Sequence, residues 1–308
     1  MRQNLTKPIR CLLWGSGSAF RDNYQTIKYF ESSDIIQVYG VTSNAPIYSE
    51  IGGYKFVSKD MLDASSFDVV IVMSYSKGVI DEICNEATVL GVNPWNIIPC
   101  SVIRQIGFDF DKYREIKKNP PTIFAPNCWG GITYHKLALR FDSPFINMYE
   151  NHDDYLKFLL NPKHYLSCEL QFKKMMFEEN LKRDFPVAMC DDILLFFNHY
   201  TSFDEANDSW NKRKQRINWN NLFVMFYDED LSRVERFCSL PYQKKICFVP
   251  FETKLKNVLS VKYRVNELME KKPFWEIVNG MASGTWLYYD VFDLLLYGRI
   301  TYAAKLLN

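Results

Sequence analysis

The stretch IRCLLWGSGSAF, residues 9–20, contains the pattern that decides the fold. Residues 9–14 form a short, mostly apolar run, Gly15 and Gly17 interrupt it, and a helical pattern follows to about Phe30. An apolar run that ends in glycines and leads into a helix is typical of a buried parallel strand followed by a crossover helix. We therefore predict a strand, a tight turn and a helix over residues 9–30.

The same alternation continues through residue 99. Apolar runs recur at residues 36–41, 67–73 and 96–99, and a helical pattern covers about residues 78–90. Strands that are separated by about 10 to 15 helical residues imply a parallel sheet covered on both faces. Residues 1–118 are therefore expected to form a Rossmann-like domain. Its linker to the next domain is expected within residues 112–121, where charges and two prolines break the pattern.

A second and larger α/β domain is expected over residues 119–308, and we place the substrate site in it. Five further apolar runs, interleaved with helical patterns, are interpreted as its buried strands. They cover residues 122–125, 145–148, 193–197, 221–227 and 245–249. The predicted fold class is thus α/β with two domains.

Composition excludes several classes of protein. The 308 residues are 47% hydrophobic, and 37 basic residues against 36 acidic ones leave a net charge of +1. No global field therefore attracts nucleic acid or an anionic membrane. No apolar run reaches the roughly 18 residues of a membrane span, and no signal peptide is recognisable.

The eight cysteines include no C-x-x-C pair. In a chain of this size that usage is typical of reduced thiols in a cytoplasm, which is the location we expect. No metal site is predicted. In particular, Asp191 and Asp192 stand at the start of a predicted strand, which argues against the metal-binding carboxylate motif of sugar transferases.

Gly15, Gly17 and Ser18 are the candidate cofactor-binding residues, because amides at a helix start can bind a phosphate. Two parts of the dinucleotide fingerprint are absent: Phe20 replaces its third glycine, and no acidic residue follows the second strand. A tight turn in a ligand-free or nucleotide-sugar-like domain is the favoured interpretation. The identity of any cofactor is left unknown, and a nicotinamide-dependent oxidoreductase is the weaker alternative.

Asn127, Cys128, Trp129, Gly130 and Gly131 lie between a predicted strand and a predicted helix. Free amides and the helix dipole favour a phosphate or carboxylate there, and glycines leave room for it. The same field would give Cys128 thiolate character, so a nucleophile is conceivable. The sequence shows no evident His-Asp partner for the thiol, and a small buried residue is therefore the favoured interpretation of Cys128.

His199 is the candidate acid/base residue, because an imidazole titrates near neutrality and this one follows an apolar strand. Other predicted strands end at Asn151-His152, Asp228 and Glu252, and the carboxyl ends of parallel strands are where ligands collect. A histidine that is hydrogen-bonded within the packing is the alternative.

Arg213 and Arg216 complete the candidate anion site. Ser202 or Thr201 is expected to cap a helix in which Arg213 falls on the apolar stripe, whereas Lys212 points outward. A guanidinium directed at the sheet requires a carboxylate or a bound anion. The two explanations stay open.

Over residues 120–250 the chain resembles a bacterial family whose members are often labelled exopolysaccharide biosynthesis proteins. The resemblance rests on a set of motifs: Asn127-Cys-Trp-Gly-Gly131, Asp142-Ser-Pro-Phe-Ile-Asn147, His199-Tyr200, Glu205-Ala206, Trp210 through Arg213, and Arg216-Ile-Asn-Trp-Asn-Asn221. The first domain is similar to the small nucleotide-binding-like domains that precede sugar-modifying enzymes. The resemblance implies a context, the assembly of cell-surface polysaccharide or glycan.

The leading hypothesis is a transferase of that context that acts on a phosphorylated sugar or nucleotide-sugar. His199 would be its acid/base, and Gly130, Gly131, Arg213 and Arg216 would bind phosphate. The alternative is a non-catalytic anion-binding or assembly module. A homodimer is a further possibility, since the aromatic segment over residues 286–298 predicts a helix suited to core or dimer contacts.

Overall fold

The computed structural model describes residues 7–44, 49–179, 182–261, 272–284 and 289–302. The chain divides into two compact units, Met1–Arg114 and Glu115–Asn308. Helix α4 (Phe110–Lys118) contains the boundary, so most of the stretch expected as a linker is helical. Parallel sheets with helices occur in both units, which confirms the predicted α/β class.

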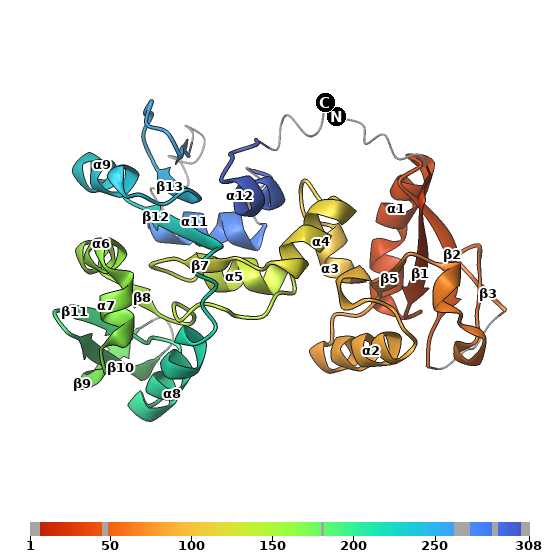
Figure 1. Cartoon of the computed structure of the whole chain (residues 1–308), viewed down its shortest axis with the longest axis horizontal. Helices are drawn as coiled ribbons and strands as arrows, with labels where there is room; N and C mark the ends of the chain where they lie inside the picture. Colours follow the sequence, from red (N-terminus) through yellow and green to blue (C-terminus); the bar gives the residue numbers. More distant parts are fainter. Residues whose placement is uncertain (1–6, 45–48, 180–181, 262–271, 285–288, 303–308) are drawn as a thin grey trace. The chain divides into compact units, whose positions relative to one another are not determined.

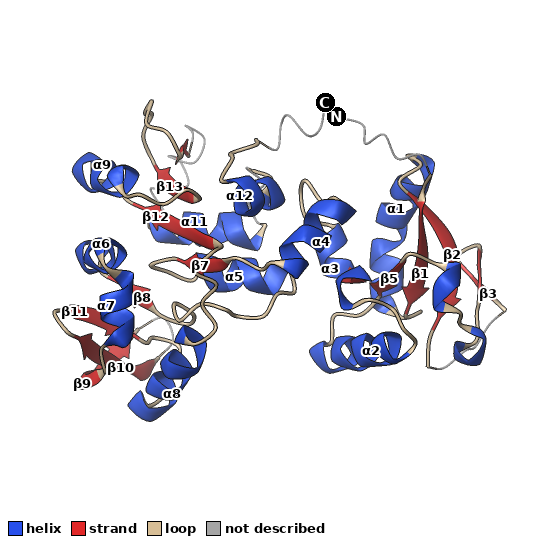
Figure 2. Ribbon diagram, viewed as in Figure 1, coloured by secondary structure: helices blue, strands red, loops and turns tan. Residues whose placement is uncertain are grey.

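Unit 1 is built on a parallel sheet with the strand order β2-β1-β5-β6 (Figure 2). Its strands are β1 (Ile9–Trp14), β2 (Ile36–Thr42), β5 (Val69–Val72) and β6 (Ile97–Pro99). A small hairpin of β3 (Glu50–Ile51) and β4 (Tyr54–Lys55) follows β2. The helices are α1 (Ser18–Ser32), α2 (Lys77–Val89) and the short α3 (Cys100–Ile103). Each predicted strand is present: β5 and β6 are buried throughout, and the carboxyl-terminal residues of β1 and β2 are buried as well.

Gly15 and Gly17 form the turn between β1 and α1, as predicted. Gly15 has a φ of 123°, and a β-carbon on it would lie 2.6 Å from the carbonyl oxygen of Met73. Only glycine fits at that position. Gly17 faces open space, and Ser18 is the exposed first residue of α1.

Unit 2 contains a parallel sheet with the order β14-β13-β12-β7, which we call the parallel sheet. Its strands are β7 (Thr122–Phe124), β12 (Leu222–Tyr227), β13 (Lys245–Val249) and β14 (Val258–Ser260). The helices associated with it are α5 (Trp129–Lys136), α6 (His152–Leu160), α9 (Leu231–Ser239), α11 (Phe274–Ser283) and α12 (Val291–Tyr297), and Figure 1 shows them on either side of β7 and β12.

A second sheet in unit 2, the antiparallel sheet, has the order β8-β11-β10-β9. Its strands are β8 (Tyr149–Glu150), β11 (Ile193–Phe196), β10 (Arg183–Cys190) and β9 (Gln171–Glu178). The helices near it are α7 (Pro162–Ser167) and α8 (Phe203–Lys214), and Ser202 caps α8 as predicted. Two expectations fail here. Residues 145–148 are irregular rather than a strand, and residues 193–196 pair antiparallel.

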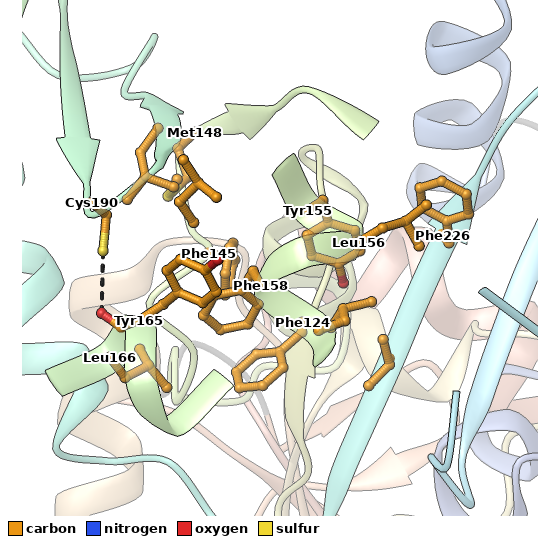
Figure 3. Packing of buried hydrophobic residues seen from close by; sticks show 14 of the residues in the cluster. Phe124, Phe145, Met148, Tyr155, Leu156, Phe158, Tyr165, Leu166, Cys190 and Phe226 are labelled. Carbon is orange, nitrogen blue, oxygen red and sulfur yellow. Dashed lines mark hydrogen bonds between the residues drawn. The ribbon is translucent and has the colours of Figure 1, made fainter. Parts of the chain in front are cut away.

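Alternate residues along the strands of the parallel sheet point to opposite faces of the sheet. Phe124, Val224 and Phe226 point into a large core that they share with α6, α9 and the antiparallel sheet, and part of this core is drawn in Figure 3. Their neighbours Ile123 and Phe223 face helix α5, whose Trp129 stacks on Phe223. The sheet is therefore buried on both faces, and its strand ends carry the polar residues.

The closing helix α12 is shorter than the aromatic helix expected over residues 286–298. Phe292, Leu294 and Leu295 are buried, as a core helix requires. Residues 286–288 of the expected helix lie outside the described residues. Among the helices described, none is both long and apolar enough to cross a membrane.

Candidate functional site

The carboxyl end of β7 carries the first part of the candidate site. Asn127 and Cys128 follow this strand, and Cys128 is the residue that precedes helix α5. Strand β12 runs parallel to β7, so Tyr227 and Asp228 leave the sheet at the same edge. The predicted convergence of polar strand ends is thus present between these two strands.

Cys128 and His199 form a direct pair. The Nε2 atom of His199 lies 3.5 Å from the Sγ atom of Cys128, within hydrogen-bond reach of a sulfur atom. The peptide N–H of His199 donates to the carbonyl of Asn147 at 3.3 Å, which holds the loop after β11 in place. The partner that sequence analysis did not find for the Cys128 thiol is therefore His199.

Both members of this pair are shifted towards their uncharged forms. Burial raises the pKa of the Cys128 thiol. The protein packed around the imidazole, and then the charge of Arg183, lower the pKa of His199, although one side of that residue stays exposed. Glu178 opposes the shift only in part. The resting pair is a thiol beside a neutral imidazole that can accept its proton.

Arg183 is the cation that approaches His199. Its Nη2 atom donates to the carbonyl oxygen of Asn198 at 3.1 Å, one residue before the histidine. The buried Nε atom of Arg183 and the buried Oδ1 atom of Asn198 have no hydrogen-bond partner among the described residues. Buried polar groups are normally satisfied, so this pair has bonding capacity left for a polar ligand.

Asn127, which follows β7, also has a buried polar group without a partner among the described residues. Its Oδ1 atom accepts the peptide N–H of Trp129 at 3.1 Å, which satisfies one amide at the start of α5. Its Nδ2 atom is buried and has no partner within the described part of the chain. Asn127 is only 5% exposed, so this free N–H group favours a ligand acceptor.

A second histidine pair lies on the same edge of the parallel sheet. The Nδ1 atom of His152 is 2.8 Å from a carboxylate oxygen of Asp228, and the Nε atom of Arg233 is 2.6 Å from the same oxygen. Burial opposes ionisation of Asp228, but the hydrogen bonds from His152 and Arg233 prevail and hold the pKa of that carboxyl well below its ordinary value. The carboxylate thus orients His152.

Tyr227, the last residue of β12, contacts the second histidine pair. Its ring is 4.7 Å from that of His152, centroid to centroid, and perpendicular to it. Burial raises the pKa of its phenol, and the charge of Asp228 raises it further. The phenol therefore stays protonated and can donate a hydrogen bond at neutral pH.

Trp129, Gly130 and Gly131 make packing contacts in the structure. The Trp129 indole is fully buried and donates to the hydroxyl of Tyr289 at 2.9 Å. A β-carbon on Gly130 would lie 3.3 Å from side-chain atoms of Ala125 and Ile123. Gly130 therefore lets α5 lie close to β7.

Replacement of Gly130 by valine is expected to destabilise unit 2 by about 1 to 3 kcal/mol, because added methyl groups overpack a filled contact with the strand. Gly131 is the matched control. Its β-carbon would lie 3.8 Å from Ile146, an ordinary contact, so Gly131→Ala should be neutral or stabilise by up to about 1 kcal/mol through helix propensity. Urea denaturation measures both. Equal destabilisation by the two variants would contradict the packing role of Gly130.

Arg213 is bound by uncharged protein groups. Its Nη1 atom donates to the carbonyl of Ile146 at 3.2 Å and to the hydroxyl of Tyr200. The guanidinium also lies 5.9 Å from the centroid of the Phe141 ring. Neither expected partner, a carboxylate or an anion, is needed to satisfy this nitrogen. Arg213 instead ties α8 to the segment that carries Tyr200 and His199.

Arg216 is placed at the other end of β7. Its charge interacts with Arg140 and Asp142, and its Nε atom donates to the carbonyl of Lys212 at 3.2 Å. The carbonyl of Asp142 accepts the hydroxyl of Thr122, the first residue of β7. The structure thus brings Asn127, Cys128 and His199 together but does not bring Arg216 to them.

Sequence analysis missed Arg183 as a site residue. The residue lies at the start of β10, whereas the argument from parallel strands considered only residues that follow a strand. Because β10 and β11 are antiparallel, the start of one lies beside the end of the other. The two-residue turn at Asp191 and Asp192 was the available signal, because such a turn indicates an antiparallel pair of strands.

Comparison with protein families identifies the family of this chain. A family model described as a domain of unknown function, DUF1919, matches residues 100–297, a range that contains Cys128, Arg183 and His199. The chain belongs to the DUF1919 family. A second model, described as C2185-like, N-terminal, matches residues 8–98, which lie in unit 1.

A relative of this chain is an uncharacterized protein of Haemophilus influenzae. It is 28% identical over 209 residues, which cover 66% of this chain and 96% of the relative. Among solved structures, aspartate semialdehyde dehydrogenase II from Vibrio cholerae gives a TM-score of 0.27 at 9% identity, covering 71% of this chain and 66% of that chain. A TM-score of this size supports no inference about function.

Proposed function

We propose that unit 2 is a group transferase in which Cys128 is the nucleophile and His199 accepts and returns its proton. The observation that carries this proposal is the 3.5 Å separation of the Cys128 Sγ and His199 Nε2 atoms at the carboxyl end of a parallel strand. A nucleophile within reach of a base is the arrangement that covalent catalysis requires.

An acyl group is the group that a thiol transfers most directly. In the first step the Cys128 sulfur attacks the carbonyl carbon of an acyl donor while its proton moves to Nε2 of His199. The bond to the donor's leaving group then breaks, and His199 returns the proton to that leaving group. In the second step an acceptor hydroxyl attacks the thioester carbonyl carbon and His199 takes the hydroxyl proton. The carbon–sulfur bond then breaks, and His199 returns the proton to the Cys128 sulfur, which restores the thiol.

The acceptor that we propose is a phosphorylated sugar or nucleotide-sugar of a cell-surface glycan pathway, handled in the cytoplasm. This part of the proposal rests on the resemblance of residues 120–250 to proteins labelled for exopolysaccharide biosynthesis. It is supported by unsatisfied groups beside the pair. Among the described residues the Nε atom of the Arg183 cation and the Nδ2 atom of Asn127 have no hydrogen-bond partner. Both suit the oxygens of a phosphate or sugar.

His152 and Tyr227 have a secondary place in this proposal. Asp228 orients His152, and the ring of Tyr227, at the end of the strand that pairs with β7, packs against the ring of His152. A phenol that stays protonated can donate to the oxygen of the tetrahedral intermediate. We therefore assign Tyr227 as the candidate donor to that oxygen.

Trapping the covalent intermediate tests the proposal. The full chain is incubated with short acyl thioesters and its intact mass is recorded before and after addition of sugar phosphates and nucleotide-sugars. We expect one acyl adduct, located on Cys128 by peptide mapping, which an acceptor removes. Cys238→Ser is the matched control, because Cys238 is also a half-buried free thiol. It should leave the adduct unchanged.

Two outcomes would contradict the transferase. Full acylation and transfer by Cys128→Ser would show that another group is the nucleophile. Tight binding of a sugar phosphate without any adduct or product would favour the non-catalytic binding module instead.

A further inference from the structure

A second group of reactive side chains lies outside the candidate site. It consists of His164, Cys168 and Asp191, and we call it the His-Cys-Asp cluster. His164 belongs to α7, Cys168 directly follows that helix, and Asp191 lies in the turn between β10 and β11. None of the three takes part in the Cys128–His199 chemistry.

The ligand atoms of the cluster converge on one point. The Nε2 atom of His164 is 2.7 Å from a carboxylate oxygen of Asp191 and 3.9 Å from the Sγ atom of Cys168, and all three ligand atoms lie within 4.8 Å of one another. In a tetrahedral zinc site with bonds of about 2.0 to 2.3 Å, ligand atoms lie about 3.3 to 3.8 Å apart. Side-chain shifts of about 1 Å or less would produce that spacing.

The backbone of α7 and of the turn between β10 and β11 positions the three residues of the cluster. His164 lies in the last turn of α7 and Cys168 is the residue that ends the helix, and the Sγ atom of Cys168 lies 3.4 Å from the carbonyl oxygen of His164. Asp191 has a φ of 52°, the left-handed conformation that aspartate tolerates in a two-residue turn. Its neighbour Asp192 accepts hydrogen bonds from Lys157 at 3.0 Å and from Tyr165 at 2.9 Å. The turn that presents Asp191 is therefore anchored to α6 and α7.

The chemistry of the cluster selects among metals. An imidazole nitrogen, a thiolate and a carboxylate are the ligand types of zinc sites, whereas magnesium and calcium prefer oxygen ligands alone. Lys157 is paired with Asp192 and Asp154, so its charge is already compensated. Three protein ligands would leave the fourth position to a water molecule.

We propose that His164, Cys168 and Asp191 bind one Zn²⁺ ion. The ion joins the end of α7 to the turn between β10 and β11. This inference does not depend on the proposed transferase, because the three residues belong to neither histidine pair.

Cobalt provides the test, because a thiolate bound to Co²⁺ produces an intense charge-transfer absorption. The metal-free full chain is titrated with Co²⁺, and Zn²⁺ is then added in competition. We expect one equivalent of Co²⁺ to produce the thiolate band and Zn²⁺ to abolish it. Cys168→Ser should remove the band, and Cys238→Ser, the matched thiol control, should retain it.

Variants of the other two ligands make the assignment specific. His164→Ala and Asp191→Asn should each weaken Zn²⁺ binding by about tenfold or more, the scale of losing a metal-site contact. Asparagine keeps the left-handed backbone of residue 191, so Asp191→Asn should fold, and circular dichroism verifies this. A thiolate band that survives Cys168→Ser, or Zn²⁺ affinity unchanged in both variants, would overturn the proposal. The cluster would then be a surface ion pair.

Discussion

Replacement of Cys128 by serine is expected to lower acyl transfer by about 10³-fold or more, because a serine hydroxyl is far less acidic and a far weaker nucleophile than a thiol. His199→Ala should cost about 10² to 10⁴, the usual contribution of a general base. The two losses should not add in the double variant, since both residues act in one step. Steady-state turnover of an acyl thioester with a sugar-phosphate acceptor measures all three.

The pH dependence of the same reaction follows from the two pKa shifts. His199 accepts a proton only when it is neutral, and its pKa lies below the ordinary 6.5. The rate constant kcat/KM should therefore rise with pH, reach half its maximum below pH 6.5 and stay level through neutrality, because the Cys128 thiol ionises only above its ordinary value of 9.0. A rate that falls between pH 7 and pH 8 would contradict this assignment.

Glu150→Gln is expected to stabilise the protein by about 1 to 3 kcal/mol at pH 8 and by clearly less at pH 5. Glu150 is 3% exposed, and neither carboxylate oxygen has a hydrogen-bond partner among the described residues. Burial, and then the charge of Asp154, raise its pKa well above the ordinary value of 4.5. The folded protein must therefore hold this side chain protonated.

The sign of the effect follows from proton linkage. Between the ordinary and the raised pKa of Glu150, the folded state binds a proton that the unfolded state has lost. The stability contributed by Glu150 is thus fully present below about pH 4.5 and declines as pH rises. Because glutamine cannot ionise, the Glu150→Gln variant should not lose this stability as pH rises.

Urea denaturation at pH 5, 6, 7 and 8 measures the difference between the wild-type chain and Glu150→Gln. Glu235→Gln is the control, because Glu235 is an exposed glutamate of α9, and its substitution should change stability by less than about 0.5 kcal/mol at every pH. A gap between wild type and Glu150→Gln that does not widen with pH would show that the buried carboxyl finds a partner in solution.

The predictable parts of the fold are those in which a strand is buried on both faces. Residues 9–14 and 245–249 form strands with those same bounds, because a continuous apolar run in a short segment has few other stable arrangements. Strand β9 was missed. It is an edge strand with mostly exposed side chains, and the pair Lys173-Lys174 removes any apolar pattern. Residues 145–148 look like a strand but are irregular, since Asn147 has a φ of 64°.

The candidate site was predictable as separate pieces. A glycine-rich strand end at residues 127–131 and a histidine after an apolar strand at residue 199 are both visible in the sequence. Their contact was not, because Cys128 follows a strand of the parallel sheet and His199 a strand of the antiparallel one. The hydrophobic periodicity of a sequence predicts its strands but does not predict how two sheets pack against each other. For Arg213 the position on the apolar stripe of its helix was predicted, but its hydrogen-bond partners were not. They are a backbone carbonyl oxygen and a tyrosine hydroxyl.

The separation of Cys128 and His199 along the chain has a consequence for biosynthesis. The two residues are 71 positions apart, and a ribosome that adds about 5 to 20 residues per second needs roughly 4 to 14 seconds to cover that interval. During that time the emerging polypeptide carries the thiol without its base. Reactivity of Cys128 should therefore be latent in nascent and truncated chains and begin only when the later strands have been made and have docked. Chains that terminate early would not acylate themselves or their neighbours.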